Sequence, residues 1–237
     1  MTSRATLTLG RDRYRVGPWH ADPEIAYLAL TPESPRVRDD SLRACLDRLG
    51  GEGYRSVITS ALHTDETGPF LRLGFEEFDR LRVLAADLDE PTRGPEVPSG
   101  YRLRRARRSD RAPALDTDRR AFPDFWQLDA ESMHDAESAT PSSRFRVVEG
   151  PSGVVAYAIT GRSGGQAFLQ RLATDPAHQG RGLATALCRD AMRWARRRCH
   201  RLLVNTQTDN DRALALYHRL GFELTPSDLV VLRRPLP

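Results

Sequence analysis

The chain has 237 residues, of which 39% are hydrophobic, so it can bury the core of one large domain or of two smaller ones. Its formal charge is +4, and no apolar run reaches the length that crosses a membrane. The first residues, MTSRATLTLGRDRYRVG, lack the continuous apolar core of a secretory signal. The three cysteines form no C-x-x-C pair, and no His/Cys spacing resembles a zinc site. We therefore expect a cytoplasmic protein that binds neither a membrane nor a metal.

A linker interrupts the chain before its midpoint. The stretch DEPTRGPEVPSG (89–100) is rich in proline and glycine and poor in apolar residues, which is typical of a connection between domains. It predicts a first domain over residues 1–88 and a second over residues 101–237, both of ordinary domain size.

The second segment has the pattern of a chain that mixes strands and helices. A strand is expected at 101–106, and helices are expected at 111–122 and 129–138. Glycine turns then separate three strands, at 145–149, 154–160 and 166–174. A helix, a strand, a second helix and a last strand complete the order. This order predicts an α/β fold of the α+β type, a mixed sheet with helices on both faces.

Two arginine runs raise the question of nucleic-acid binding. All 36 basic residues are arginine, and they cluster in RLRRARRSDR (102–111) and RWARRRCHR (193–201). The second run forms the polar side of a helix whose other face is apolar, so a solvated face is the better interpretation. We expect no nucleic-acid partner, although such charge would also help to hold a small polyanionic ligand.

The clearest chemical signal is the stretch LATDPAHQGRGLATAL (172–187). A strand ends there, Pro176 forces a turn, and Gly180 and Gly182 open a helix whose first turn bears no bulky side chain. The amides at such a helix start have no partner within the helix, and the helix dipole adds positive potential. The stretch therefore predicts a cradle for a phosphate group.

A second pattern, NDRALALYHRLGF (210–222), follows it in the chain. With the glycine loop, it resembles the GNAT superfamily of N-acetyltransferases over roughly residues 98–237. The loop matches the family's Gln-x-x-Gly-x-Gly/Ala spacing, and the second pattern matches at Asn210, Ala213, Leu216, Tyr217, Gly221 and Phe222. The resemblance implies the acyl-CoA N-acyltransferase fold.

The resemblance also implies acetyl-CoA as co-substrate and a set of residues around it. The pyrophosphate would lie against the amides of Gln179, Gly180, Arg181, Gly182, Leu183, Ala184 and Thr185. The pantetheine arm would run along the strand end formed by Leu172, Ala173 and Thr174. Asn210 and Ala213, at the start of the next helix, complete the set, and Tyr217 would protonate the departing thiolate.

Two of these residues have a purely structural alternative. Asn210 can cap the helix that follows it instead of contacting the cofactor. Tyr217 shares a helix face with Ala213 and Leu220, so it can pack in the core instead of acting as an acid.

The general base is not assigned by the sequence. Many family members carry a carboxylate on the strand before the glycine loop, but here that strand reads AFLQRLAT, with Phe168 near the relevant place. Either the base lies elsewhere or the amine arrives neutral. The other acidic or titratable candidates are Asp124, Asp129, Glu131, His134 and Asp135, beside the aromatic pair Phe125 and Trp126.

The pentapeptide RLGFE occurs twice, at 72–76 and at 219–223. By itself it predicts a helix that stops at a glycine and continues into a strand. The flanks also correspond, because LALTPE (28–33) and RSVITSA (55–61) resemble the strands before the glycine loop and before the second pattern. In place of the loop the first copy has SPRVRDDS (34–41), whose aspartates would repel a phosphate. We therefore expect residues 1–88 to be a degenerate half-domain that does not bind CoA.

These observations predict an N-acetyltransferase that transfers an acetyl group from acetyl-CoA to the primary amine of a small molecule or a protein. The alternative is a regulatory or scaffold protein that binds CoA without turnover, which the missing strand carboxylate favours and the intact Tyr217 opposes. A homodimer is compatible with the sequence.

Overall fold

The computed structural model describes residues 4–20, 22–31 and 37–237. The chain forms two compact units whose segments interleave along the sequence. The first unit runs to Val83 and also takes in Thr206–Asp209 and Thr225–Pro237, while the second holds Leu84–Asn205 and Asn210–Leu224. The sequence analysis expected consecutive domains, 1–88 and 101–237 with a linker at 89–100, and that division remains a prediction.

In the first unit, an antiparallel meander leads into a parallel crossover. Its strands lie in the order β1-β2-β3-β4-β13-β6, and β4 is parallel to β3 because helix α1 connects them. The helix α1 buries Leu42, Cys45, Leu46 and Leu49, which recur at helical spacing. The elements are β1 (Ala5–Leu9), β2 (Asp12–Trp19), β3 (Asp22–Leu30), α1 (Asp39–Gly51), β4 (Ser56–Thr59), β5 (Leu62–His63), α2 (Gly68–Arg72), β6 (Glu76–Asp87) and β13 (Leu229–Pro235).

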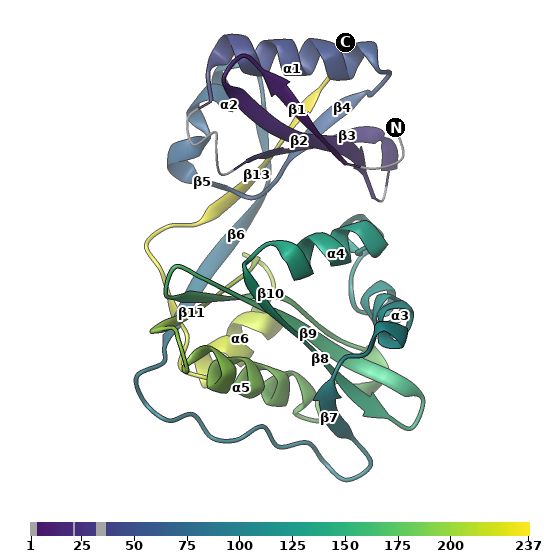
Figure 1. Cartoon of the computed structure of the whole chain (residues 1–237), viewed down its shortest axis with the longest axis vertical. Helices are drawn as coiled ribbons and strands as arrows, with labels where there is room; N and C mark the ends of the chain where they lie inside the picture. Colours follow the sequence, from purple (N-terminus) through teal and green to yellow (C-terminus); the bar gives the residue numbers. More distant parts are fainter. Residues whose placement is uncertain (1–3, 21, 32–36) are drawn as a thin grey trace. The chain divides into compact units, whose positions relative to one another are not determined.

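The second unit has the mixed sheet and the element order that the sequence predicts. Its strands lie in the order β6-β11-β10-β9-β8-β7, with β10 and β11 parallel and β7 to β10 antiparallel (Figure 1). The elements are β7 (Arg102–Arg105), α3 (Arg111–Ala121), α4 (Ala130–Ser138), β8 (Ser142–Gly150), β9 (Gly153–Ser163), β10 (Gln166–Thr174), α5 (Leu183–Ala195), β11 (Arg201–Gln207), α6 (Asp211–Arg219) and β12 (Glu223–Leu224).

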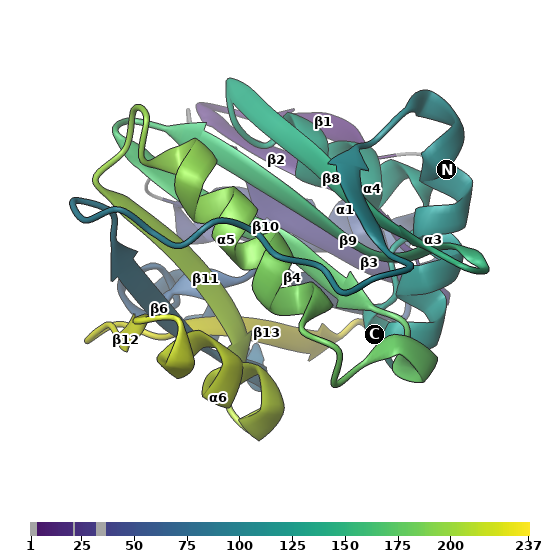
Figure 2. The same cartoon turned by 90° about the horizontal axis from the view of Figure 1, so that it is seen from below.

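Both faces of the second sheet are buried, which explains why β9 reads as an apolar run without alternation. Val155 and Ala158 pack in the core that α5 and α6 cover, whereas Tyr157 and Ile159 pack in the core that α3 and α4 cover. Figure 2 shows α5 and α6 on the same side of β10 and β11. The expected fold class, a mixed sheet with helices on both faces, is confirmed.

The two RLGFE copies end their helices with the same hydrogen bonds. Gly74 and Gly221 have φ angles of 80° and 83°, which glycine adopts without steric cost. The amide of the following Phe75 or Phe222 donates to the carbonyl of Phe70 or Tyr217, at 3.2 Å and 3.0 Å respectively. This bond is typical of a helix that stops at a left-handed glycine, so the predicted helix stop is confirmed in both copies.

The two halves also share an order of elements. Apart from the two-residue strand β5, the order β3-α1-β4-α2-β6 in the first half parallels β10-α5-β11-α6-β12 in the second. Residues 32–36, which include parts of the LALTPE and SPRVRDDS stretches, lie outside the described residues. The shared order supports the proposed half-repeat, and common descent of the two halves stays a prediction. The strands β1 and β2 were not assigned from the sequence.

Two long strands account for the interleaving of the units. The C-terminal strand β13 pairs antiparallel with β4 and β6 in the first unit, although it follows α6 in the chain. The strand β6 pairs with β13 through residues up to Leu81, and its end lies in the second unit, where Leu84 and Ala85 pair with β12. The strand β6, from the first half of the chain, therefore ends in the second unit, and β13, from the second half, belongs to the first unit.

Candidate functional site

The helix α5 begins at a glycine that is held in the left-handed region. Gly180 and Gly182 have φ angles of 75° and 78°, and a Cβ atom added at either would meet nothing within 4 Å. The first bond of the helix runs from the Ala186 amide to the Gly182 carbonyl, at 2.9 Å. The amides of residues 182–185 therefore precede the first acceptor within the helix. This arrangement can hold an anion.

The turn before the loop is fixed by Asp175, which is buried. Its side chain accepts hydrogen bonds from the Ala177 amide at 2.9 Å and from Nε of Arg120 at 2.6 Å. Burial acts to raise the pKa of Asp175, but the bonds from Ala177 and Arg120 outweigh it and hold this pKa below its ordinary value. An ionised carboxylate thus fastens the turn after β10 to α3.

The strands β10 and β11 separate just before this loop. They pair only where Gln166–Phe168 faces Arg201–Leu203, and beyond Phe168 the two strands diverge (Figure 2). A bulge at Gln170 shifts the register of β10 against β9 between Leu169 and Arg171. The edge of β10 that carries Leu172, Ala173 and Thr174 thus has no strand partner on the β11 side, among the residues described. An extended ligand could pair with this backbone edge.

Hydrogen bonds of the Gln179 side chain connect the glycine loop with the end of β10 and the start of α6. Its Nε2 donates to the Thr174 carbonyl at 3.0 Å, and its Oε1 accepts a hydrogen bond from Arg212 on α6. Next to Arg212, Asn210 caps α6, because its Oδ1 accepts from the Ala213 amide at 3.1 Å. The structure therefore brings the strand end, the loop and the start of α6 together. Arg212 was missed by sequence reasoning, which considered only the family positions.

The remaining loop residues frame the start of α5. Arg181 is exposed, Leu183 is buried in the core, and Ala184 and Thr185 are half-buried in the first turn of the helix. Of these residues only Ala184 and Thr185 have small side chains.

Tyr217 lies in the core between the sheet and the helices α5 and α6. Its side chain is 5% exposed, and its ring centroid is 5.5 Å from that of Phe222. Burial raises the pKa of the Tyr217 phenol above its ordinary value, and the nearby Cys188 adds to the shift. The phenol therefore stays protonated at neutral pH and can serve as a proton donor. Packing alone also accounts for its position.

The predicted base candidates do not converge on a single group. Asp129 caps α4, because its Oδ1 accepts from the Ser132 amide at 2.7 Å. Asp124 accepts from Nε2 of Gln127 at 2.8 Å. Glu131, His134 and Asp135 lie along α4, while Phe125 and Trp126 are half-buried with their rings edge to face. The general base therefore remains unassigned.

A buried ionic network, which the sequence analysis missed, fastens β10 to α3 and the following loop. The Asp118 carboxylate is 0% exposed and accepts from Nε and Nη2 of Arg171, both at 2.8 Å, from Oη of Tyr157 at 2.5 Å and from the Leu128 amide at 2.8 Å. Arg171 also donates to the Trp126 carbonyl at 2.8 Å. The available signal was Tyr157, since a buried phenol within an apolar run needs a hydrogen-bond partner.

We expect Arg171→Met to lower the free energy of unfolding by about 3–5 kcal/mol, because it leaves the buried Asp118 charge without its main partner. Urea denaturation measures this change. The matched control is Arg119→Met, which removes an arginine paired with Asp116 at a half-exposed site, and it should cost no more than about 1 kcal/mol. Equal losses in the two variants would contradict the assigned role of the network.

None of the described helices is long and apolar enough to cross a membrane. The same part of the chain holds no group of three or more His, Cys, Asp or Glu side chains arranged to bind a metal ion.

The glycine loop and α6 both lie in the part of the chain that resembles a known protein family. Residues 107–222 match the model of the acetyltransferase (GNAT) family. The chain is 29% identical over 178 residues to the mycothiol acetyltransferase of Saccharomonospora viridis, covering 67% of this chain and 58% of that protein. It is 33% identical over 91 residues to the N-alpha-acetyltransferase RimI of Mycobacterium tuberculosis, covering 37% of this chain and 56% of that protein. The chain thus spans less than two thirds of the length of these relatives.

A solved structure also shares the fold over nearly the whole chain. A tandem GNAT protein from the clavulanic acid biosynthesis pathway superposes with a TM-score of 0.67 at 14% identity, covering 95% of this chain and 79% of that one. At this identity the likeness concerns the fold alone, and it is compatible with an extra GNAT-like half before the second unit.

Proposed function

Since residues 107–222 belong to the acetyltransferase (GNAT) family, we propose that this protein transfers an acetyl group from acetyl-CoA to a primary amine. The observation that carries the proposal is the start of α5. There Gly180 and Gly182 place no side chain beside amides that have no acceptor within the helix, next to a strand edge that has no partner on the β11 side among the described residues.

In this proposal the cofactor lies along residues that the glycine loop and its neighbours contribute. The diphosphate binds the amides of residues 179–185, and the pantetheine arm pairs with the backbone of residues 172–174. Asn210 and Ala213 hold the start of α6 against this path, an arrangement that the cap bond between them supports. The positive end of the α5 dipole strengthens the binding of the diphosphate.

The chemical step is a direct transfer. The neutral amine attacks the carbonyl carbon of the thioester, the carbon–sulfur bond breaks, and the amine nitrogen passes a proton to solvent water. The departing thiolate takes up a proton from the Tyr217 phenol, which is protonated at neutral pH. Backbone amides polarise the carbonyl as negative charge develops on its oxygen.

The start of α1 supports a single cofactor site per chain. The residue before α1 is Arg38, in an extended conformation, where the corresponding helix α5 follows a left-handed glycine. Asp39 and Asp40 occupy the first turn of α1, and Asp39 accepts two hydrogen bonds from Arg72, at 2.6 Å and 2.8 Å. Carboxylates there stabilise the free amides and repel a phosphate.

We therefore expect one acetyl-CoA per chain. Isothermal titration calorimetry measures this stoichiometry directly. A value of two would contradict the proposal that residues 1–88 form a degenerate half-domain. Variants of the first-unit helix start, such as Asp39→Asn, should leave the stoichiometry at one.

The function itself is tested by acetyl-CoA-dependent thiol release across amine classes. The panel contains small-molecule amines, polyamines, aminoglycosides, and peptides with a free N-terminus or a lysine. Because the chain has no lysine, acetylation of the protein itself is limited to its N-terminus, and mass spectrometry detects it. Tight cofactor binding with no thiol release for any amine would favour the CoA-binding regulatory protein instead.

A further inference from the structure

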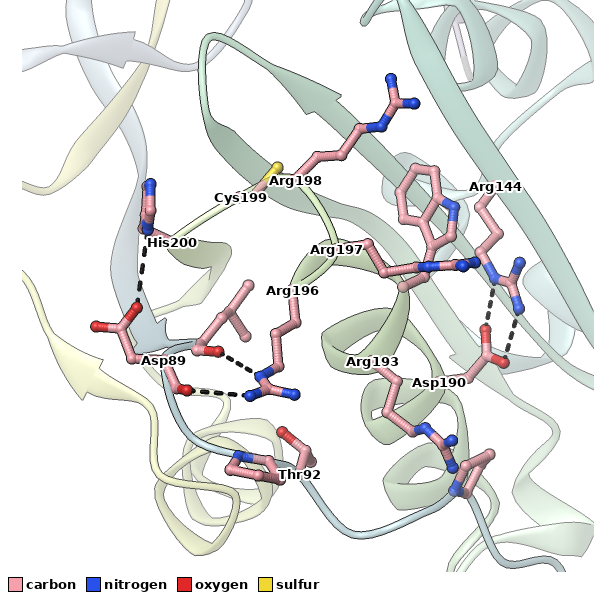
Figure 3. Close-up of a pocket in the computed structure, with 14 residues that line it drawn as sticks. Asp89, Thr92, Arg144, Asp190, Arg193, Arg196, Arg197, Arg198, Cys199 and His200 are labelled. Carbon is pink, nitrogen blue, oxygen red and sulfur yellow. Dashed lines mark hydrogen bonds and ion pairs between the residues drawn. The ribbon is translucent and has the colours of Figure 1, made fainter.

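An arginine-rich cavity lies at the far end of α5. This cavity of about 1020 Å³ opens between the end of the helix, the strand β8 and the linker that follows β6 (Figure 3). Two aspartates and five arginines are among its lining residues; the arginines are Arg144, Arg193, Arg196, Arg197 and Arg198. All the lining residues belong to the second unit.

Two of these arginines are held in place by the protein. Arg144 donates to both carboxylate oxygens of Asp190, at 2.8 Å and 3.0 Å. Arg196 donates to the carbonyls of Leu88 and Asp89, at 3.0 Å and 3.2 Å, and so fastens the linker to the end of α5 (Figure 3). These bonds hold the side chains of Arg144 and Arg196 in position, and the charge of Arg144 balances that of Asp190.

Arg193 and Arg197 have no such partner. Neither makes a hydrogen bond or an ion pair with any residue that the structure describes, although both line the cavity, Arg193 from the last turn of α5 and Arg197 from the turn after its cap residue. Two like charges that line one cavity repel each other. The negative end of the helix dipole favours cations, but this effect is weak at an exposed terminus. The cavity therefore concentrates positive charge that the described protein does not neutralise.

This site is distinct from the glycine loop. The helix α5 has 13 residues, which corresponds to a length of roughly 20 Å, and the loop lies at its other end. A CoA diphosphate at residues 179–185 therefore leaves the arginine cavity open.

We propose that this cavity binds a small molecule that carries two or more phosphate groups. A guanidinium group presents a planar fork of donors that matches phosphate oxygens, and several forks favour a ligand with several phosphates. The volume suits a molecule of nucleotide size, since ligand sites measure about 300–1000 Å³. The indole of Trp194 lines the same cavity, with Arg162 stacked on it at 3.8 Å.

The test is calorimetric binding of inorganic tripolyphosphate and of ATP, each measured with and without saturating acetyl-CoA. The variant is Arg193→Gln/Arg197→Gln, which removes two charges and keeps most of the side-chain length. The matched control is Arg105→Gln/Arg108→Gln, which removes the same charge from two exposed arginines of the second unit outside the cavity. We expect the first variant to weaken tripolyphosphate binding by about tenfold or more and the control to leave it unchanged.

The ATP measurement shows whether the cavity recognises the phosphates alone or the nucleoside as well. Equal affinity for ATP and tripolyphosphate indicates recognition of the phosphates alone, and tighter ATP binding indicates an added contact to the nucleoside. Both results support the proposal if Arg193→Gln/Arg197→Gln weakens the binding of ATP and of tripolyphosphate.

Three results would overturn it. They are no tripolyphosphate binding to the wild-type protein, equal weakening in both variants, and displacement of tripolyphosphate by acetyl-CoA. Binding of a 20-nucleotide single strand with no measurable binding of tripolyphosphate would also overturn it, since that would indicate a nucleic-acid surface. Each readout is binding, so the result does not depend on whether the protein acetylates an amine.

Discussion

Gly182→Asp is expected to abolish acetyl-CoA binding. The substitution places a carboxylate at the start of α5, where the proposed diphosphate contacts the free amides. Two unit charges 4 Å apart repel by about 4 kcal/mol at an effective dielectric constant of about 20, which corresponds to roughly a thousandfold in affinity. The left-handed φ of 78° adds backbone strain of about 1–2 kcal/mol for a residue with a side chain. Isothermal titration calorimetry measures the loss.

The control for this variant is Gly165→Asp. Gly165 has the same φ of 78°, and a Cβ atom there also meets nothing within 4 Å, but it lies in the turn between β9 and β10. The two variants therefore share the added charge and the backbone strain. Only Gly182→Asp should lose cofactor binding. Wild-type affinity in Gly182→Asp, or an equal loss in Gly165→Asp, would remove the basis for the proposed cradle.

Tyr217→Phe is expected to lower kcat by about 10²- to 10⁴-fold, the usual contribution of a positioned acid. The ring remains in the core beside Phe222, so the stability and the affinity for acetyl-CoA should stay close to those of the wild type. The raised pKa of Tyr217 means that its deprotonation cannot cause a fall in the wild-type rate below about pH 10. Steady-state kinetics over pH 6–9.5 with the best amine from the screen tests both expectations.

The matched control for the lost hydroxyl is Tyr14→Phe. Tyr14 is fully buried in the first unit, and its hydroxyl donates to Oγ of Ser41 at 3.0 Å. This variant should lose a little stability and no activity. A rate for Tyr217→Phe within a few-fold of the wild type would identify Tyr217 as a packing residue, and the proton donor would then have to be sought elsewhere.

The second unit could be predicted closely from the sequence because its signals are local. The strand 166–174 coincides with β10, and the expected helix 129–138 is observed as α4 with Asp129 as its cap. Both RLGFE helix stops were predictable for the same reason, since only the backbone freedom of one glycine decides them. The glycine loop was visible because its chemistry depends on main-chain amides and on missing side chains.

The strands β1 and β2 were less visible, although their pattern is that of a meander. Their short stretches, such as ATLTL, contain few large apolar residues, and the interpretation of residues 1–88 rested on the repeat, which begins later in the chain. In the structure β2 pairs with both β1 and β3, so these strands depend on neighbours rather than on their own propensity.

By itself the sequence determined the order of elements in the second unit, the helix stops and the position of the glycine loop. All of these depend on residues that are close together in the chain. Only the tertiary structure decided that β13 returns to the first unit, that Asp118 and Arg171 share a buried network, and that arginines from β8 and the end of α5 surround one cavity. These features depend on which side chains the folded backbone brings together across long separations, and charge or periodicity along the chain does not encode that pairing.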